Sequence, residues 1–255
     1  MNLQLAVFDM VGTTVQAGGE VPSSFREALL SVGVELSDTA IAGVRGRSKR
    51  EAISDLLAEG EEGAASGPEV VETVYRRFQD SLLRAFRSNA RSVPGAEAVF
   101  DSLRRAGVRV ALTTGLDRDT AKLLVRVLGW ENMRLLGPVT GDDVSRSRPA
   151  PDLIHAAMRL AGVTDPKAVA VVGDTTSDLD AAATAGVGWI IGVLGGAHTR
   201  DQLEAHPHSV VLESVSGLPE WLFGAKVGKP VCGAQIEAEE ERDVGGALPG
   251  KRGGS

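Results

Sequence analysis

Short runs of apolar residues alternate along most of this chain with longer segments in which apolar residues recur every three or four positions. Such short runs are typical of strands buried on both faces of a parallel sheet, and the longer segments are typical of amphipathic helices. Because most of the runs are separated by helical segments, the pattern predicts an α/β fold with a doubly wound parallel sheet. The predicted strands are residues 5–8, 108–112, a weaker one near 135, 168–172 and 189–193.

The stretch between the first strand and residue 90 carries only the helical pattern. Helical segments are predicted at about 22–33, 38–59 and 69–87, and the second is interrupted at Gly46. In the third, apolar residues spaced at helical intervals predict a packing face. We therefore expect residues 1–15 and 91–225 to form the α/β core and residues 16–90 to form an all-helical insert.

Composition and charge narrow the class of protein. Hydrophobic residues make up 43% of the 255 residues and charged residues 24%, which is enough to build a core. The net charge of -7 argues against nucleic acid as a partner, and the single cysteine excludes a disulfide within one chain. No apolar stretch is long enough to span a bilayer, so we expect a cytoplasmic protein with no membrane contact. Residues 226–255 are rich in Gly and Glu without periodicity, and we expect them to be disordered.

Polar residues stand where three of the predicted strands end. Asp9 follows the first strand, Thr114 follows the second, and Asp174 and Asp178 follow the fourth. Since the carboxyl ends of parallel strands meet at one edge of a sheet, these side chains should converge. Carboxylates together with threonine and arginine suit a phosphoryl group bound through Mg²⁺.

The residue types suggest a role for each member of this group. Asp9, Asp174 and Asp178 offer hard oxygen ligands for Mg²⁺. Thr114, in the turn with Gly115, and Arg148 can bind phosphoryl oxygens, and the hydroxyl of Thr13 can bond an oxyanion or support the site. One of the carboxylates can attack phosphorus and form an aspartyl phosphate.

The series FDMVGTT, LTTG, Arg148-Pro149 and GDTTSD resembles the four motifs of the haloacid dehalogenase superfamily. The details D-x-x-GTT, TTG, DDV followed by RP, and GDT-x-SD resemble its phosphonatase-like subfamily, which is that of phosphonoacetaldehyde hydrolase. The resemblance implies a Rossmann-like core with a small helical cap after the first strand. It implies Asp9 as nucleophile, and Mg²⁺ held by Asp9, the backbone carbonyl of Met10, Asp174 and Asp178. Phosphoryl binding would fall to Thr13, Thr114, Gly115 and Arg148.

Val11 departs from most phosphatases of the superfamily, which have there a second Asp as general acid and base. A valine cannot transfer a proton, which argues against a phosphomutase. Phosphonatases have a small apolar residue at this position and activate their substrate through an imine with a cap lysine. Lys49 falls at that lysine's position, so the resemblance makes it a candidate catalytic residue. Alternatively, Lys49 and the nearby Arg45 form a patch that binds an anionic substrate.

Other positions depart from the phosphonatase pattern. Ala52 and Leu116 stand where His and Tyr are expected, and Gly18-Gly19 lacks an expected Cys. The leading hypothesis is therefore a Mg²⁺-dependent phosphohydrolase that releases phosphate from a small phosphorylated metabolite through Asp9. The alternative is cleavage of a carbon–phosphorus bond in a phosphonate through a Lys49 imine. A 2-haloacid dehalogenase and a non-catalytic binding module are further alternatives, and the resemblance also suggests a homodimer through the cap helices.

Overall fold

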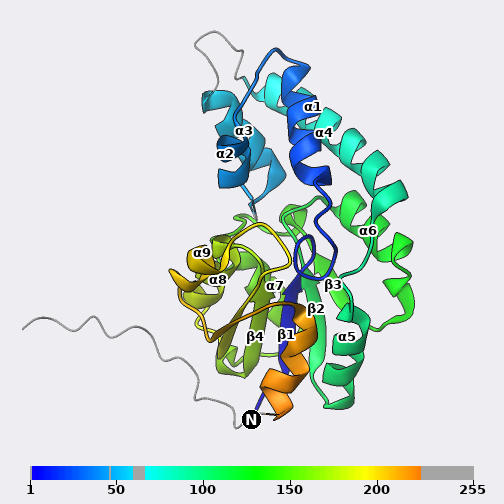
Figure 1. Ribbon diagram of the computed structural model, residues 1–255, viewed down its shortest axis with the longest axis vertical. Coiled ribbons are helices and arrows are strands. Elements are labelled where there is room, and N and C mark those ends of the chain that lie inside the picture. The colour runs from blue at the N-terminus through cyan, green and yellow to red at the C-terminus, as the bar shows by residue number, and fades with distance from the viewer. Residues whose placement is uncertain (1, 46, 60–66, 225–255) are drawn as a thin grey trace, which may run out of the picture.

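Six parallel strands form the centre of the protein. The computed structural model describes residues 2–45, 47–59 and 67–224 (Figure 1). The strands lie in the order β3-β2-β1-β4-β5-β6, so that the first strand is central and the chain winds outward on both sides. The doubly wound parallel sheet predicted from the sequence is therefore confirmed. The six strands are β1 Leu5–Asp9, β2 Arg109–Thr113, β3 Leu136–Val139, β4 Val169–Gly173, β5 Trp189–Val193 and β6 Val210–Leu212.

Helices cover both faces of this sheet. Successive side chains of β1 point to opposite faces, and all of them are buried. Ala6 and Phe8 pack with α5 (Ala96–Arg105) and α6 (Arg118–Val127) in one apolar cluster. Leu5 and Val7 pack with α7 (Asp152–Ala161) and α8 (Thr176–Thr184) in another. The short helix α9 (Arg200–Glu204) precedes β6.

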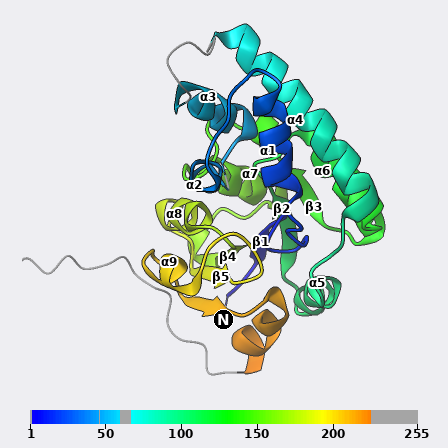
Figure 2. The same ribbon diagram turned by 45° about the horizontal axis from the view of Figure 1, so that its top comes forward.

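Four helices lie between β1 and α5, and the described part of this stretch contains no β-strand. They are α1 Glu20–Leu30, α2 Asp38–Gly43, α3 Lys49–Glu59 and α4 Pro68–Asn89. The repeated apolar residues of α4 are buried as predicted, and Phe78 packs on Phe25 of α1 with ring centroids 4.5 Å apart. Figures 1 and 2 show this cap beyond the end of the sheet toward which β1 points.

Several element boundaries differ slightly from the sequence prediction, and the strand β6 was not predicted. The first cap helix begins at Glu20 and not at Pro22, and the interruption predicted within the 38–59 segment separates α2 from α3. Gly46, most of the surface loop expected at 60–68 and the expected disordered tail lie outside the described residues, and Pro68 begins α4. No helix in the described ranges is long and apolar enough to cross a membrane.

Candidate active site

The loop after β1 holds Asp9 at the carboxyl edge of the sheet. The carbonyl oxygen of Met10 accepts hydrogen bonds from the backbone N–H groups of Thr13, Thr14 and Val15, at 3.2, 2.8 and 2.8 Å, which closes a tight turn. Gly12 adopts a φ of 102° in this turn, and a Cβ there would lie 2.2 Å from Oδ2 of Asp174. Glycine is therefore required for the β1 loop to approach the carboxylate that follows β4.

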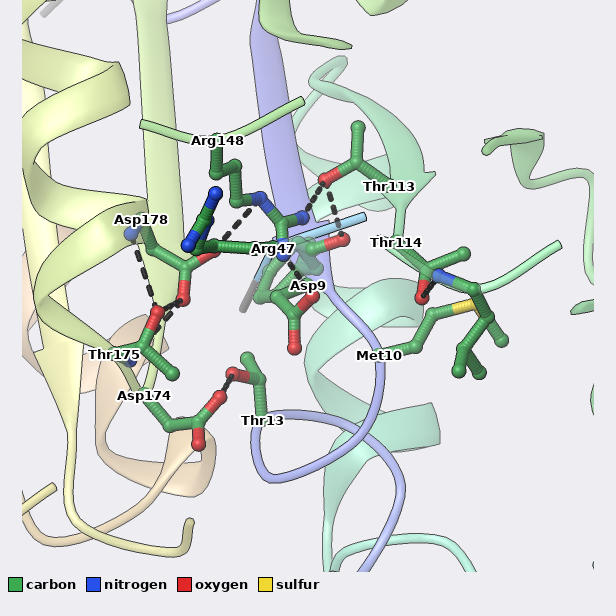
Figure 3. Close-up of polar contacts among 12 residues, drawn as sticks. Asp9, Met10, Thr13, Arg47, Thr113, Thr114, Arg148, Asp174, Thr175 and Asp178 are labelled. Carbon is green, nitrogen blue, oxygen red and sulfur yellow. Dashed lines mark hydrogen bonds and ion pairs between the residues drawn. The ribbon is translucent and has the colours of Figure 1, made fainter. Parts of the chain in front are cut away.

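Arg148 joins the strand ends through its buried guanidinium group. Its Nη1 lies 2.6 Å from Oδ1 of Asp9, and its Nε lies 2.9 Å from Oδ1 of Asp178. Its Nη2 donates to the hydroxyl of Thr113 at 2.8 Å. Figure 3 shows Arg148 between Asp9 and Asp178, with Asp174 on the side of Thr13. Arg148 therefore fixes the orientation of Asp9.

Asp174 is held by two neighbours on the other side of Asp9. The hydroxyl of Thr13 donates to its Oδ1 at 3.0 Å, and the N–H of Ala197 donates to its Oδ2 at 2.8 Å. A Cβ on Gly196 would lie 1.9 Å from Oδ2, so that the loop after β5 also reaches the carboxylate only because it has a glycine there. The loops after β1, β4 and β5 thus converge at Asp9 and Asp174.

The aspartates are close enough to repel one another. Burial, together with the charge of Asp178, raises the pKa of Asp9 to about 6, although Arg148 opposes this. Burial and the charges of Asp9 and Asp178 raise the pKa of Asp174 well above its ordinary value. A bound cation would relieve this repulsion and favour the ionised carboxylates.

A cavity of about 200 Å³ opens between the sheet edge and the cap. The sheet side contributes Asp9, Thr114, Gly115, Arg148 and Asp174, so most residues predicted to form the site are brought together. The cap contributes Arg45 and Lys49, which were also predicted, and in addition Glu20. Thr13 lies behind this wall, where it bonds Asp174.

Lys49 is the first residue of α3, and only 6% of its surface is exposed. In the described part of the chain, its ammonium group donates one hydrogen bond, to the carbonyl oxygen of Arg47 at 3.1 Å. Burial lowers its pKa from 10.5 to about 8, although the negative charge of Asp9 partly opposes the shift. Its amine is therefore far easier to deprotonate than that of an exposed lysine.

The structure shows how three of the predicted site residues are held. The Met10 carbonyl accepts hydrogen bonds from the loop, and Met10 has no exposed surface. Both carboxylate oxygens of Asp178 are engaged by Arg148 and Thr175, so this residue orients Arg148. Arg148 lines the cavity, and its donors face protein groups. The roles of these residues as Mg²⁺ or phosphoryl ligands stay predictions.

Sequence reasoning missed Thr113, the Ala197 N–H and Glu20. Thr113 precedes the predicted Thr114 and its side chain points to the other side of the strand, where it accepts from Arg148. A backbone donor such as the Ala197 N–H leaves no signal in residue types. A signal for Glu20 existed, since it begins the first cap helix, but an acidic residue is common in that position for other reasons.

The geometry agrees with what comparison with known proteins shows. The model of the haloacid dehalogenase-like hydrolases matches residues 3–186. The chain belongs to this family. Like its relatives, it is a hydrolase that carries the family's motifs on the strand ends described above.

A curated relative and two solved structures are similar over most of the chain. Phosphonoacetaldehyde hydrolase of Bacillus cereus is 27% identical over 206 residues, which cover 77% of this chain and 78% of the relative. A hydrolase from Pseudomonas syringae has a TM-score of 0.77 at 25% identity, covering 86% of this chain and 97% of that one. A phosphonoacetaldehyde hydrolase-like protein from Oleispira antarctica has a TM-score of 0.77 at 22% identity, covering 86% and 90%, and shares the fold.

Proposed function

We propose that this hydrolase cleaves the carbon–phosphorus bond of a small phosphonate that carries a carbonyl group next to the phosphonate-bearing carbon. The observation that supports this most is the buried Lys49, which lines the same cavity as Asp9 and has a pKa of about 8. A lysine with a lowered pKa in such a cavity is suited to imine formation. The relative from Bacillus cereus, named phosphonoacetaldehyde hydrolase, supports the same substrate class.

The proposed reaction begins at Lys49 and passes through an aspartyl phosphate on Asp9. The neutral amine of Lys49 condenses with the substrate carbonyl and releases water, giving an imine that is then protonated. A carboxylate oxygen of Asp9 attacks phosphorus, and the electron pair of the breaking carbon–phosphorus bond moves toward the iminium nitrogen, giving an enamine. Protonation at carbon and hydrolysis release the aldehyde or ketone and regenerate Lys49. Water then cleaves the aspartyl phosphate and releases phosphate.

The donor set fits a hard divalent cation such as Mg²⁺. Asp9 and Asp174 are buried carboxylates whose pKa values are raised in part by negative neighbours, and Arg148 bridges Asp9 and Asp178. Among the described residues, no three acidic, cysteine or histidine side chains form a complete metal cluster. Two carboxylates completed by substrate oxygens and water are an ordinary arrangement for Mg²⁺. The ion would neutralise phosphoryl charge while Asp9 attacks.

A second candidate is hydrolysis of a small phosphate monoester, the leading hypothesis from the sequence. Leu116 lines the cavity, and Ala52 is fully buried, where the phosphonatase resemblance predicts residues able to bond or move protons. In this case Lys49 stays protonated and binds the anionic substrate together with Arg45.

The two candidates are separated by one set of assays. We expect purified protein with Mg²⁺ to release phosphate and acetaldehyde from phosphonoacetaldehyde, and borohydride to trap the substrate on Lys49. Lys49→Arg keeps the positive charge but cannot form the imine, so it should abolish this reaction. If Lys49→Arg cleaves the phosphonate at the normal rate, the imine mechanism is wrong. Phosphate release from monoesters by that variant would favour the second candidate.

Asp9→Asn is the common test of both candidates. Removal of the nucleophile should abolish phosphate release from every substrate, while the melting temperature stays near that of the unmodified protein. Normal turnover by Asp9→Asn would refute the assignment of the nucleophile in both mechanisms.

A further inference from the structure

Glu20 brings a carboxylate to the cap side of the cavity, and neither proposed mechanism uses it. It is the first residue of α1 and lines the cavity together with Arg45 and Lys49. Its Oε2 atom is buried, and no described residue gives it a hydrogen bond. A buried carboxylate oxygen without a donor is costly, so its presence in a cavity suggests a donor that arrives with a ligand.

An acidic residue in the first turn of a helix has a common structural explanation, since it is attracted by the free N–H groups there. That explanation fits poorly here. Glu20 Oε2 receives no hydrogen bond from any backbone N–H of the described residues. An acid that served only the helix terminus would also gain by keeping its carboxylate in water.

Gly18 supports the same interpretation through its lack of a side chain. A Cβ at this position would lie 2.5 Å from Oε1 of Glu20. The Glu20 side chain therefore folds back over Gly18, and it can keep this conformation only beside a residue without a Cβ. Because the atom in conflict is the far end of a flexible side chain, an alanine at position 18 would displace the carboxylate rather than the backbone.

The neighbours of Glu20 indicate the kind of group that it would bind. Arg45 and Lys49 line the same cavity, so an additional ammonium group on the substrate would meet positive charge. A hydroxyl group donates a hydrogen bond without adding charge. The cavity of about 200 Å³ limits the organic part of such a substrate to a few carbon atoms.

We propose that Glu20 accepts a hydrogen bond from a hydroxyl group on the organic part of the substrate, so that the enzyme selects hydroxylated phosphonates or phosphate esters. The inference rests on the proposed function, because it requires the phosphoryl group to lie at Asp9. It holds for either class of bond, since Glu20 lies on the cap side of the cavity.

The test compares two pairs of substrates that differ by one hydroxyl group. The phosphonate pair is 3-hydroxy-2-oxopropylphosphonate and 2-oxopropylphosphonate, and the ester pair is 2-hydroxypropyl phosphate and propyl phosphate. In the pair that is turned over, we expect kcat/KM to favour the hydroxylated member by about 10- to 100-fold, as a hydrogen bond to a charged group allows. Glu20→Leu should bring this ratio close to one.

Two further variants keep the test decisive if Glu20→Leu folds poorly. Gly18→Ala leaves Glu20 in place but displaces its carboxylate, so it should also lower the ratio. Glu35→Gln is the matched control, because Glu35 is exposed in the loop after α1, and its ratio should equal that of the unmodified protein.

The outcomes separate this inference from the proposed function. The proposed function is contradicted if neither the four compounds nor phosphonoacetaldehyde releases phosphate in a reaction that depends on Asp9. Equal turnover of both members by the unmodified protein, or an unchanged hydroxyl preference in both Glu20→Leu and Gly18→Ala, would overturn only the role of Glu20.

Discussion

The burial of Lys49 lowers the free energy of unfolding of the protein. Because burial lowers its pKa from 10.5 to about 8, the folded state binds this proton less tightly than the unfolded state does. Below pH 8 the lysine therefore destabilises the fold, and this cost disappears as the pH rises from 8 to 10.5. The proposed role of Lys49 in the reaction would account for this cost.

Replacing this lysine with an apolar residue of similar shape should stabilise the protein. We expect Lys49→Met to raise the free energy of unfolding at pH 7 by about 1 to 3 kcal/mol, in proportion to the pKa shift, while activity is lost. The gain should shrink between pH 8 and 10.5. Urea unfolding at several pH values measures it, and Lys122→Met, at an exposed position of α6, should show no such gain.

The same pKa gives the two candidate reactions opposite pH profiles. An imine needs the neutral amine, which is roughly a tenth of Lys49 at pH 7 and most of it above pH 9. Cleavage of a phosphonate should therefore accelerate from pH 7 toward 9. Hydrolysis of an ester that is bound by protonated Lys49 should slow over this range. Initial rates with each substrate, measured at saturating Mg²⁺, distinguish the two, and a flat profile would contradict both roles.

At the scale of elements, the start of α8 links helix capping to the site. Thr175 caps this helix: its hydroxyl lies 2.5 Å from Oδ2 of Asp178, and the backbone N–H of Asp178 donates back to it at 3.3 Å. The other oxygen of Asp178 holds Nε of Arg148 at 2.9 Å, and Arg148 in turn holds Asp9. The motif that begins the helix therefore also aligns Asp9, the proposed nucleophile.

This connection predicts different effects for two similar substitutions. Thr175→Val and Thr199→Val each remove the hydroxyl of a capping box, in α8 and α9 respectively. Each should cost about 1 kcal/mol of stability in urea unfolding. Only Thr175→Val should also lower kcat, because it frees Asp178 and lets Arg148 move. An equal loss of kcat in Thr199→Val would show that the effect is one of stability alone.

At the scale of the whole molecule, the cavity lies where the cap meets the sheet. Asp9 ends β1 and Asp174 directly follows the neighbouring strand β4, whereas Lys49 and Glu20 begin the cap helices α3 and α1. In the function proposed above, the phosphoryl group would lie on the side of the sheet and the organic group on the side of the cap. The homodimer through cap helices stays a prediction, which size-exclusion chromatography can examine.

Because strand ends must come together to make the metal site, Mg²⁺ should stabilise the folded chain. At a concentration 100 times its dissociation constant, the ion would add about 2.7 kcal/mol and raise the melting temperature. Asp174→Asn should lose this shift, and EDTA should abolish phosphate release until Mg²⁺ is restored. Full activity in EDTA would contradict the magnesium site.

Much of the fold and part of the site followed from short-range pattern. The strands of the core were predicted because an apolar run followed by a turn is a local signal, and Trp189–Val193 agrees at both ends. The interruption of the 38–59 segment at Gly46 was predicted, whereas the start of α1 at Glu20 and the strand β6 were missed. β6 has three residues, of which only Val211 is buried, so its apolar pattern is a weak local signal.

The sequence by itself determined that Asp9, Thr114 and Asp174 would end parallel strands, and therefore that they would share one edge of a sheet. Only the tertiary structure decided how their atoms are used. Arg148 meets Asp9 across 139 residues and Thr13 meets Asp174 across 161, and no local pattern records which oxygen each donor will reach. The burial that lowers the pKa of Lys49 and leaves Oε2 of Glu20 without a donor among the described residues exists only once the cap has folded over the sheet, because removal from water is a property of all the surrounding groups together.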